Sequence, residues 1–293
     1  MRSRLPLTAL LLAAACGGAS ASDRVSVMAV DRLSGELGAQ DVELPGTDLT
    51  AVRGPAGIVL LDGTRTPDCQ LRRKVSGSLV ARTLPCVSLL GHYAAMERAR
   101  QFLLSAGAEA LPPALVLAEE SATPGLHYLA SNDAFTLAEG PRGARVPAAL
   151  NPGAVAREMA RRQLRGVADA HPEEAEGIAL FLGAAAAADP GYLAASELGG
   201  DPTGNLDLAR PLPAGAPSSA ILAGALWAWA DASGDLTGAA RAALADARAL
   251  PSGSADAAAV LSLVADQLDG AERDQACAVF RSRLRAAGIS ACP

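Results

Sequence analysis

The sequence predicts an α+β fold in which a strand-rich N-terminal part is followed by a mainly α-helical part. Up to about residue 137, apolar residues form short runs that are bounded by turn residues, which is typical of strands. From Asn151 onward, apolar residues recur at helical spacing instead. The pattern divides the chain into a leader and tether (residues 1–22), a mixed α/β part (23–150) and a helical part (151–293).

The N-terminal part is expected to hold several short strands around one helix. An amphipathic pattern over 91–106 predicts the helix, which Gly107 should end. A turn is expected at Ser131-Asn132-Asp133. The predicted extended segments are 25–27, 57–63, 75–83, 115–117 and 135–137.

The helical part should begin at Asn151, a favourable N-cap, with Pro152 as its first helical residue. Trp227 and Trp229 lie two apart on one predicted helix and cannot share a face, so we expect one in the core and one at the surface. The predicted helices span 152–165, 172–188, 217–231, 235–249, 254–268 and 270–287.

The first residues follow a secretory plan. Arg2 and Arg4 precede an apolar stretch, and three alanines lead into Cys16, which resembles the bacterial lipobox. We therefore expect lipidation of Cys16 and attachment to the bacterial cell envelope, with Gly17 favouring the outer membrane. The alternative is an ordinary signal that is cleaved near residues 19–22. The apolar run is too short to span a membrane.

Composition limits the partners and the core. The chain carries 25 basic and 31 acidic residues, and loss of Arg2 and Arg4 makes the balance more negative, which argues against nucleic acid as a partner. The mature chain of about 270 residues can bury a large core. Because aromatic residues make up only 3%, that core must consist mainly of Leu, Val and Ala.

Four of the five cysteines follow Cys16, and an even number in an exported chain predicts two disulfides. Four cysteines allow three pairings. The simplest joins sequence neighbours, Cys69 with Cys86 and Cys277 with Cys292. No C-x-x-C spacing suggests that they bind metal instead.

One segment of the helical part has the pattern of a catalytic motif without its ligands. Residues 157–161 read Arg-Glu-Met-Ala-Arg, where His at both ends would give H-E-x-x-H. Glu176-Gly177 follows, similar to the E-G-x-A-D segment that carries the third zinc ligand in thermolysin-like (gluzincin) metallopeptidases. Further weak similarities lie in the family's order in residues 91–100, 127–137, 189–191 and 220–227.

The resemblance implies a zincin-like fold in which Glu158 matches the general base and Glu176 the third ligand. Arg157 and Arg161 occupy the positions of the two His ligands, and a guanidinium group has no lone pair for zinc. Leu180 replaces the Asp that orients a ligand. We therefore expect a pseudopeptidase with no metal and no cofactor. If the geometry persists, Arg157 and Arg161 share a helix face and pair with Glu176.

Other chemistry has weaker signals. His171, with the acids at 173 and 174, could offer a metal ligand, but a helix start explains these acids equally well. There is no G-x-S-x-G, G-x-G-x-x-G or Walker motif. Three functions stay open: an inactive peptidase-like lipoprotein that binds a peptide or protein, a helical structural or adaptor lipoprotein unrelated to peptidases, and a metallohydrolase with unconventional ligands.

Overall fold

The computed structural model describes residues 24–31, 36–119, 122–139, 147–193, 206–210, 212, 215–250, 256–285 and 292. The lipobox with Cys16 and the predicted cleavage region lie outside the described residues. No helix in the described ranges is long and apolar enough to cross a membrane.

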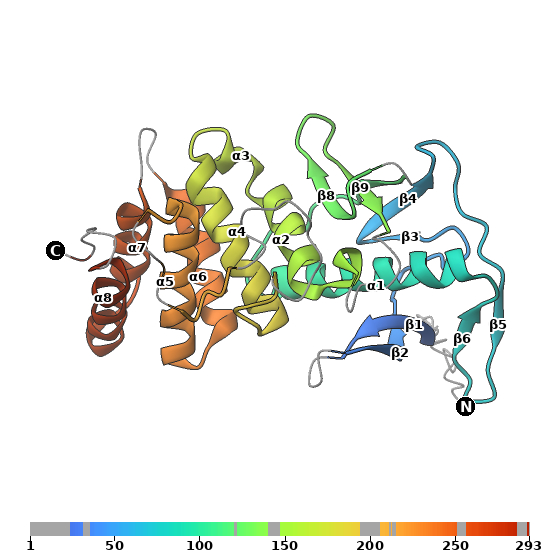
Figure 1. Ribbon diagram of the computed structural model, residues 1–293, viewed down its shortest axis with the longest axis horizontal. Helices are drawn as coiled ribbons and strands as arrows, with labels where there is room; N and C mark the ends of the chain where they lie inside the picture. The colour runs from blue at the N-terminus through green and yellow to red at the C-terminus, as the bar shows by residue number, and fades with distance from the viewer. Residues whose placement is uncertain are drawn as a thin grey trace, which may run out of the picture.

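The fold is α+β, with strands in the N-terminal half and helices in the C-terminal half, as the sequence predicts (Figure 1). Two sheets form the N-terminal half. The four-stranded sheet has the order β2-β1-β6-β5, and the five-stranded sheet has the order β3-β4-β7-β9-β8. The strands are β1 (Arg24–Val30), β2 (Leu37–Glu43), β3 (Arg53–Gly54), β4 (Gly57–Leu61), β5 (Leu71–Arg73), β6 (Leu79–Ala81), β7 (Leu115–Ala118), β8 (Gly125–Leu129) and β9 (Ala134–Ala138).

In the five-stranded sheet, the central strands β4, β7 and β9 are parallel, and β8 pairs antiparallel with β9 at one edge. The turn between β8 and β9 includes Asp133, which adopts a left-handed conformation (φ 48°). Helix α1 (Leu84–Ser105) runs between the two sheets (Figure 1). The Tyr93 hydroxyl on α1 accepts the backbone N–H of Ala56 at 3.2 Å and so links the helix to the loop before β4.

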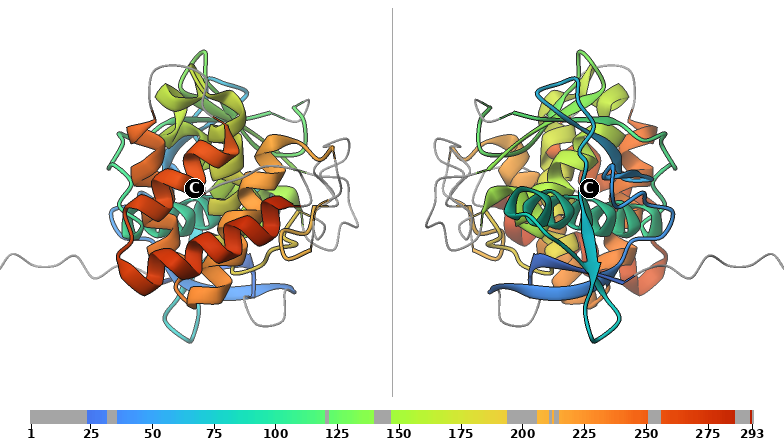
Figure 2. Two further views of the ribbon diagram at one scale, coloured as in Figure 1. Left: turned by 90° about the vertical axis from the view of Figure 1, so that its left-hand side faces the viewer. Right: turned by 90° about the vertical axis from the view of Figure 1, so that its right-hand side faces the viewer.

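The helices of the C-terminal half start and end close to the predicted residues. The longer helices are α2 (Pro152–Gln163), α4 (Pro172–Ala187), α5 (Ser218–Ser233), α6 (Leu236–Ala249), α7 (Ala257–Asp266) and α8 (Gly270–Leu284). The short helices η1 (Ala148–Leu150) and α3 (Arg165–Ala168) flank α2. In the left-hand view of Figure 2, the helices α5 to α8 face the viewer. One cluster of buried apolar side chains extends through both halves.

Three local predictions were wrong. Helix α1 begins at Leu84 rather than at 91, and a proline in its first turn favours this early start. The expected strand over 75–83 is shorter, because residues 74–78 form the turn between β5 and β6 and leave Val75 fully exposed. Trp227 and Trp229 are both buried, because α5 packs against α4, α6, α7 and α8 and has no open face.

The predicted disulfide pairing is confirmed. Cys69 bonds to Cys86 in the first turn of α1, and Cys277 on α8 bonds to Cys292, with 5.6 Å between the Cα atoms of each pair. The backbone N–H of Cys292 also donates to the Ser262 hydroxyl on α7 at 3.3 Å, so Cys292 is held against both α7 and α8. Two disulfides fit an extracytoplasmic protein.

Replacing Cys277 and Cys292 together with Ala should lower the free energy of unfolding by about 3 kcal/mol, because the lost crosslink closes a short loop. The sequence separation is 15 residues, and that of Cys69 and Cys86 is 17, so the second double replacement should have a similar effect. Urea unfolding of the oxidised wild type and both variants measures this. An unchanged unfolding midpoint in either variant would show that its disulfide contributes no stability.

Candidate functional site

Helix α2, which carries Arg157 to Arg161, packs against helix α4, which carries Glu176. The side chain of Asn151 caps α2 by accepting the N–H groups of Gly153 at 3.0 Å and Ala154 at 3.1 Å, as predicted. Its amide also donates to the Tyr192 carbonyl at 2.7 Å. The cap therefore joins the start of α2 to the segment that follows α4.

Two glycines allow α2 and α4 to approach closely. A Cβ atom on Gly153 would lie 2.4 Å from the Tyr192 ring, and one on Gly183 would lie 2.7 Å from the Gly153 carbonyl. Neither distance leaves room for a larger side chain. Burial raises the pKa of Tyr192, whose hydroxyl donates to the Leu180 carbonyl at 3.4 Å, so this ring is a neutral packing element.

Arg157 and Arg161 on α2 converge on Glu176 of α4. Arg157 donates from Nε to Glu176 Oε1 at 2.9 Å, and its Nη2 atom donates to the same oxygen. Arg161 donates from Nε to Glu176 Oε2 at 2.7 Å. Both oxygens of Glu176 are therefore occupied by guanidinium groups from the helix that packs against it.

Glu158 completes what we call the Arg–Glu cluster (Arg157, Glu158, Arg161 and Glu176). Its Oε1 accepts Arg161 at 2.8 Å, and its Oε2 accepts the backbone N–H of Tyr128 at 2.9 Å. Tyr128 lies on the edge strand β8, so this bond attaches α2 to the rim of the sheet. All four carboxylate oxygens of the cluster are hydrogen-bonded, and two positive charges balance two negative ones.

The cluster is largely removed from water. The side chains of Glu158 and Arg157 are 6% and 8% exposed, whereas those of Glu176 and Arg161 are 22% and 35% exposed. Leu180, at the position of the family's orienting Asp, is fully buried among apolar neighbours. The arrangement can hold two helices and a strand together, and neither carboxylate has an oxygen free to activate water.

The other candidate ligands do not gather around this cluster. His171 is buried at the start of α4, with Glu173 exposed beside it. In the described ranges, no group of three or more His, Cys, Asp or Glu side chains lies close enough to hold a metal ion.

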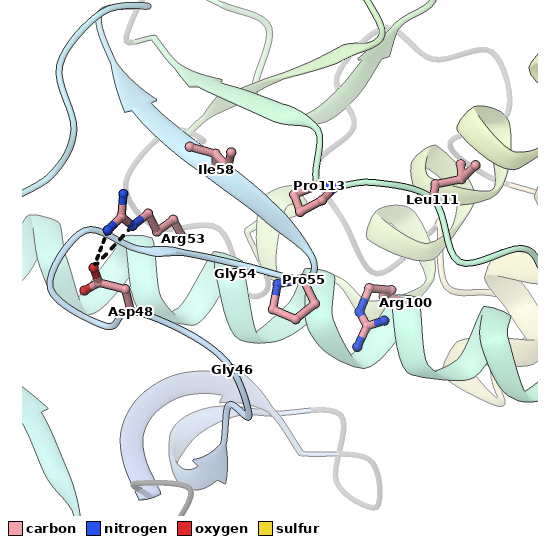
Figure 3. A pocket seen from close by; sticks show the side chains of 9 residues that line it. All are labelled: Gly46, Asp48, Arg53, Gly54, Pro55, Ile58, Arg100, Leu111 and Pro113. Atoms are coloured by element: carbon pink, nitrogen blue, oxygen red, sulfur yellow. Dashed lines mark hydrogen bonds and ion pairs between the residues drawn. The ribbon is translucent and has the colours of Figure 1, made fainter. Parts of the chain in front are cut away.

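Another part of the surface has a pocket that the sequence did not predict. It lies between the loop that carries Asp48, the helix α1 and the segment before β7 (Figure 3). Asp48 pairs with Arg53 at 3.2 Å, and Arg100 makes a bidentate bond to Glu97 at 2.6 and 2.8 Å. The backbone N–H of Ala51, first among several donors, lowers the pKa of Asp48. Because these charged groups already have partners, this pocket offers little to a ligand.

Comparisons with known proteins give no assignment. No protein-family model matches the chain, and the search of curated proteins finds no match.

Proposed function

We propose that this chain is an exported, catalytically inactive peptidase-like protein, anchored by lipidated Cys16, that binds a peptide or protein. The observation that carries the proposal is the convergence of Arg157 and Arg161 on Glu176, with Glu158 beside them. These are the positions that the H-E-x-x-H resemblance assigns to three zinc ligands and the general base. The convergence of these four positions, three on α2 and one on α4, is the arrangement that a zincin site requires and so supports the proposal.

The sheet supports the same interpretation. The resemblance assigns residues 127–137 to the strands beside the substrate cleft, and β8 is an antiparallel edge strand that contacts α2. The backbone N–H of Tyr128 donates to the Glu158 carboxylate and is therefore not free to pair with another strand. A peptide that adds to β8 as a further strand has to displace this carboxylate.

Rebuilding the ligand set tests the proposal. The double replacement Arg157→His and Arg161→His restores two imidazoles one helical turn apart, with Glu176 facing them. We expect this variant to bind about one equivalent of Zn²⁺, measured by elemental analysis after gel filtration. The wild type should bind no stoichiometric zinc and cleave no generic peptide.

Adding Glu176→Gln to the double variant is the matched control. If Glu176 is the third ligand, its loss should weaken zinc binding at least tenfold, because loss of a group that only supports a ligand already costs roughly that much. Equal affinity with and without Glu176, in variants that retain the wild-type circular dichroism, would contradict the zincin geometry. The helical adaptor function would then replace the proposal, whereas zinc-dependent activity of the wild type would favour the metallohydrolase.

A further inference from the structure

A second pocket, which we call the His92 pocket, lies at the carboxyl ends of the parallel strands. It has a volume of about 960 Å³. The strands β4, β7 and β9 run in the same direction, so their last residues meet at one edge of the sheet, beside the N-terminal end of α1. In Figure 1 this end of α1 lies toward the right of the view. Ligands of open α/β sheets bind at such carboxyl edges, and the volume suits an organic molecule.

The residues that line the pocket include an apolar set and an acidic set. Glu119 follows β7 and Glu139 follows β9, and neither carboxylate has an ion pair or hydrogen bond in the described part of the chain. Asp62 is different, because it pairs with Arg65 across a turn. The larger apolar residues that line it are Leu61, Leu84, Pro85, Leu89 and Leu137. Among the described residues, the pocket therefore carries two carboxylates without a cationic partner next to apolar side chains.

His92 on α1 lines this pocket and is 4% exposed. Its Nδ1 atom is buried and has no hydrogen-bond partner among the residues that the structure describes. Burial lowers the pKa of His92 to about 4, although Glu139 acts in the opposite direction, so the ring is neutral near pH 7 and does not offset the acids. Buried polar atoms without partners are rare in folded proteins, and an unfilled ligand contact is one physical reason for them.

We propose that the His92 pocket binds an alkylammonium group, with the charged nitrogen near Glu119 and Glu139 and the alkyl stem on the apolar residues. An ammonium group supplies three N–H donors, which matches two carboxylates and an imidazole. The group can belong to a free amine or to the lysine side chain of a peptide. The inference does not depend on the Arg–Glu cluster, because it uses different residues at another edge of the fold.

Titration of the mature full-length protein with hexylammonium, followed by the Cε1–H resonance of His92, tests this. The chain has three histidines, so His127→Asn and His171→Asn variants assign the signal. We expect saturable binding with a shift of the His92 resonance. 1-Hexanol has the same alkyl stem without the charge. Its affinity should be lower by roughly tenfold or more, because it cannot form charge-assisted hydrogen bonds.

The variant Glu119→Gln/Glu139→Gln should also weaken hexylammonium binding by roughly tenfold or more. Glu173→Gln, which removes an exposed acid on α4, should leave it unchanged. If N-acetyl-Gly-Lys-Gly-amide binds about as tightly as hexylammonium, the ammonium group that the pocket recognises belongs to a peptide lysine. If only hexylammonium binds, the ligand is a small free amine. Equal affinity for hexanol, full affinity in the double variant, or an unmoved His92 resonance would overturn the proposal.

Discussion

Replacing Glu176 with Gln is expected to lower the free energy of unfolding by about 3 kcal/mol, because it leaves the buried guanidinium group of Arg157 facing an uncharged amide, whereas Arg161 keeps its ion pair with Glu158. The side chain of Arg157 is only 8% exposed, so water cannot replace the lost partner. Chemical denaturation monitored by circular dichroism measures the effect.

Two controls separate this cluster from a general loss of charge. Glu173→Gln, at an exposed position on the same helix, should change stability by less than about 1 kcal/mol. The double change Arg157→Met/Glu176→Leu should recover much of the loss, because an apolar pair removes both charges together. Equal unfolding midpoints for Glu176→Gln and Glu173→Gln would show that the cluster does not stabilise the contact between α2 and α4.

Asp246→Asn should make the protein more stable at pH 8. It should also remove the part of the pH dependence of the free energy of unfolding that comes from this carboxyl group. Asp246 on α6 is fully buried, and its Oδ1 accepts a hydrogen bond from Gln267, whereas its Oδ2 has no hydrogen-bond partner in the described ranges. Burial raises the pKa of Asp246 from 3.8 to about 7, and the nearby Asp266 acts in the same direction. Ionisation of this carboxyl is therefore much less favourable in the folded protein than in the unfolded chain.

The sign follows from proton binding. Between pH 4 and 7 the folded protein holds a proton on Asp246 that the unfolded chain has released, so raising the pH favours unfolding. From pH 5 to 8 the wild type should lose roughly 2–3 kcal/mol relative to Asp246→Asn. Urea unfolding across this range measures the difference, with Asp274→Asn at an exposed position of α8 as the control. A constant difference between wild type and Asp246→Asn would mean that Asp246 does not titrate in this range.

Local sequence was sufficient to predict where the helices of the C-terminal half lie. Asn151 and Pro152 mark a helix start through backbone preferences that act within one turn, and the observed α2 begins at Pro152. The spacing of Arg157 and Arg161 puts them on one face of any helix. The disulfides joined neighbours in sequence, because short loops bring their ends together most readily.

Long-range packing decided the remainder. The Arg–Glu cluster forms because α4 brings Glu176 to α2, and the bond from Tyr128 to Glu158 exists because β8 is the strand beside that helix. Both tryptophans are buried because four helices surround α5, which no periodicity within α5 reveals. The His92 pocket joins residues from three strands and one helix. Sequence thus determined what depends on neighbours along the chain, whereas contacts between distant segments, on which both proposed sites depend, were decided only by the tertiary structure.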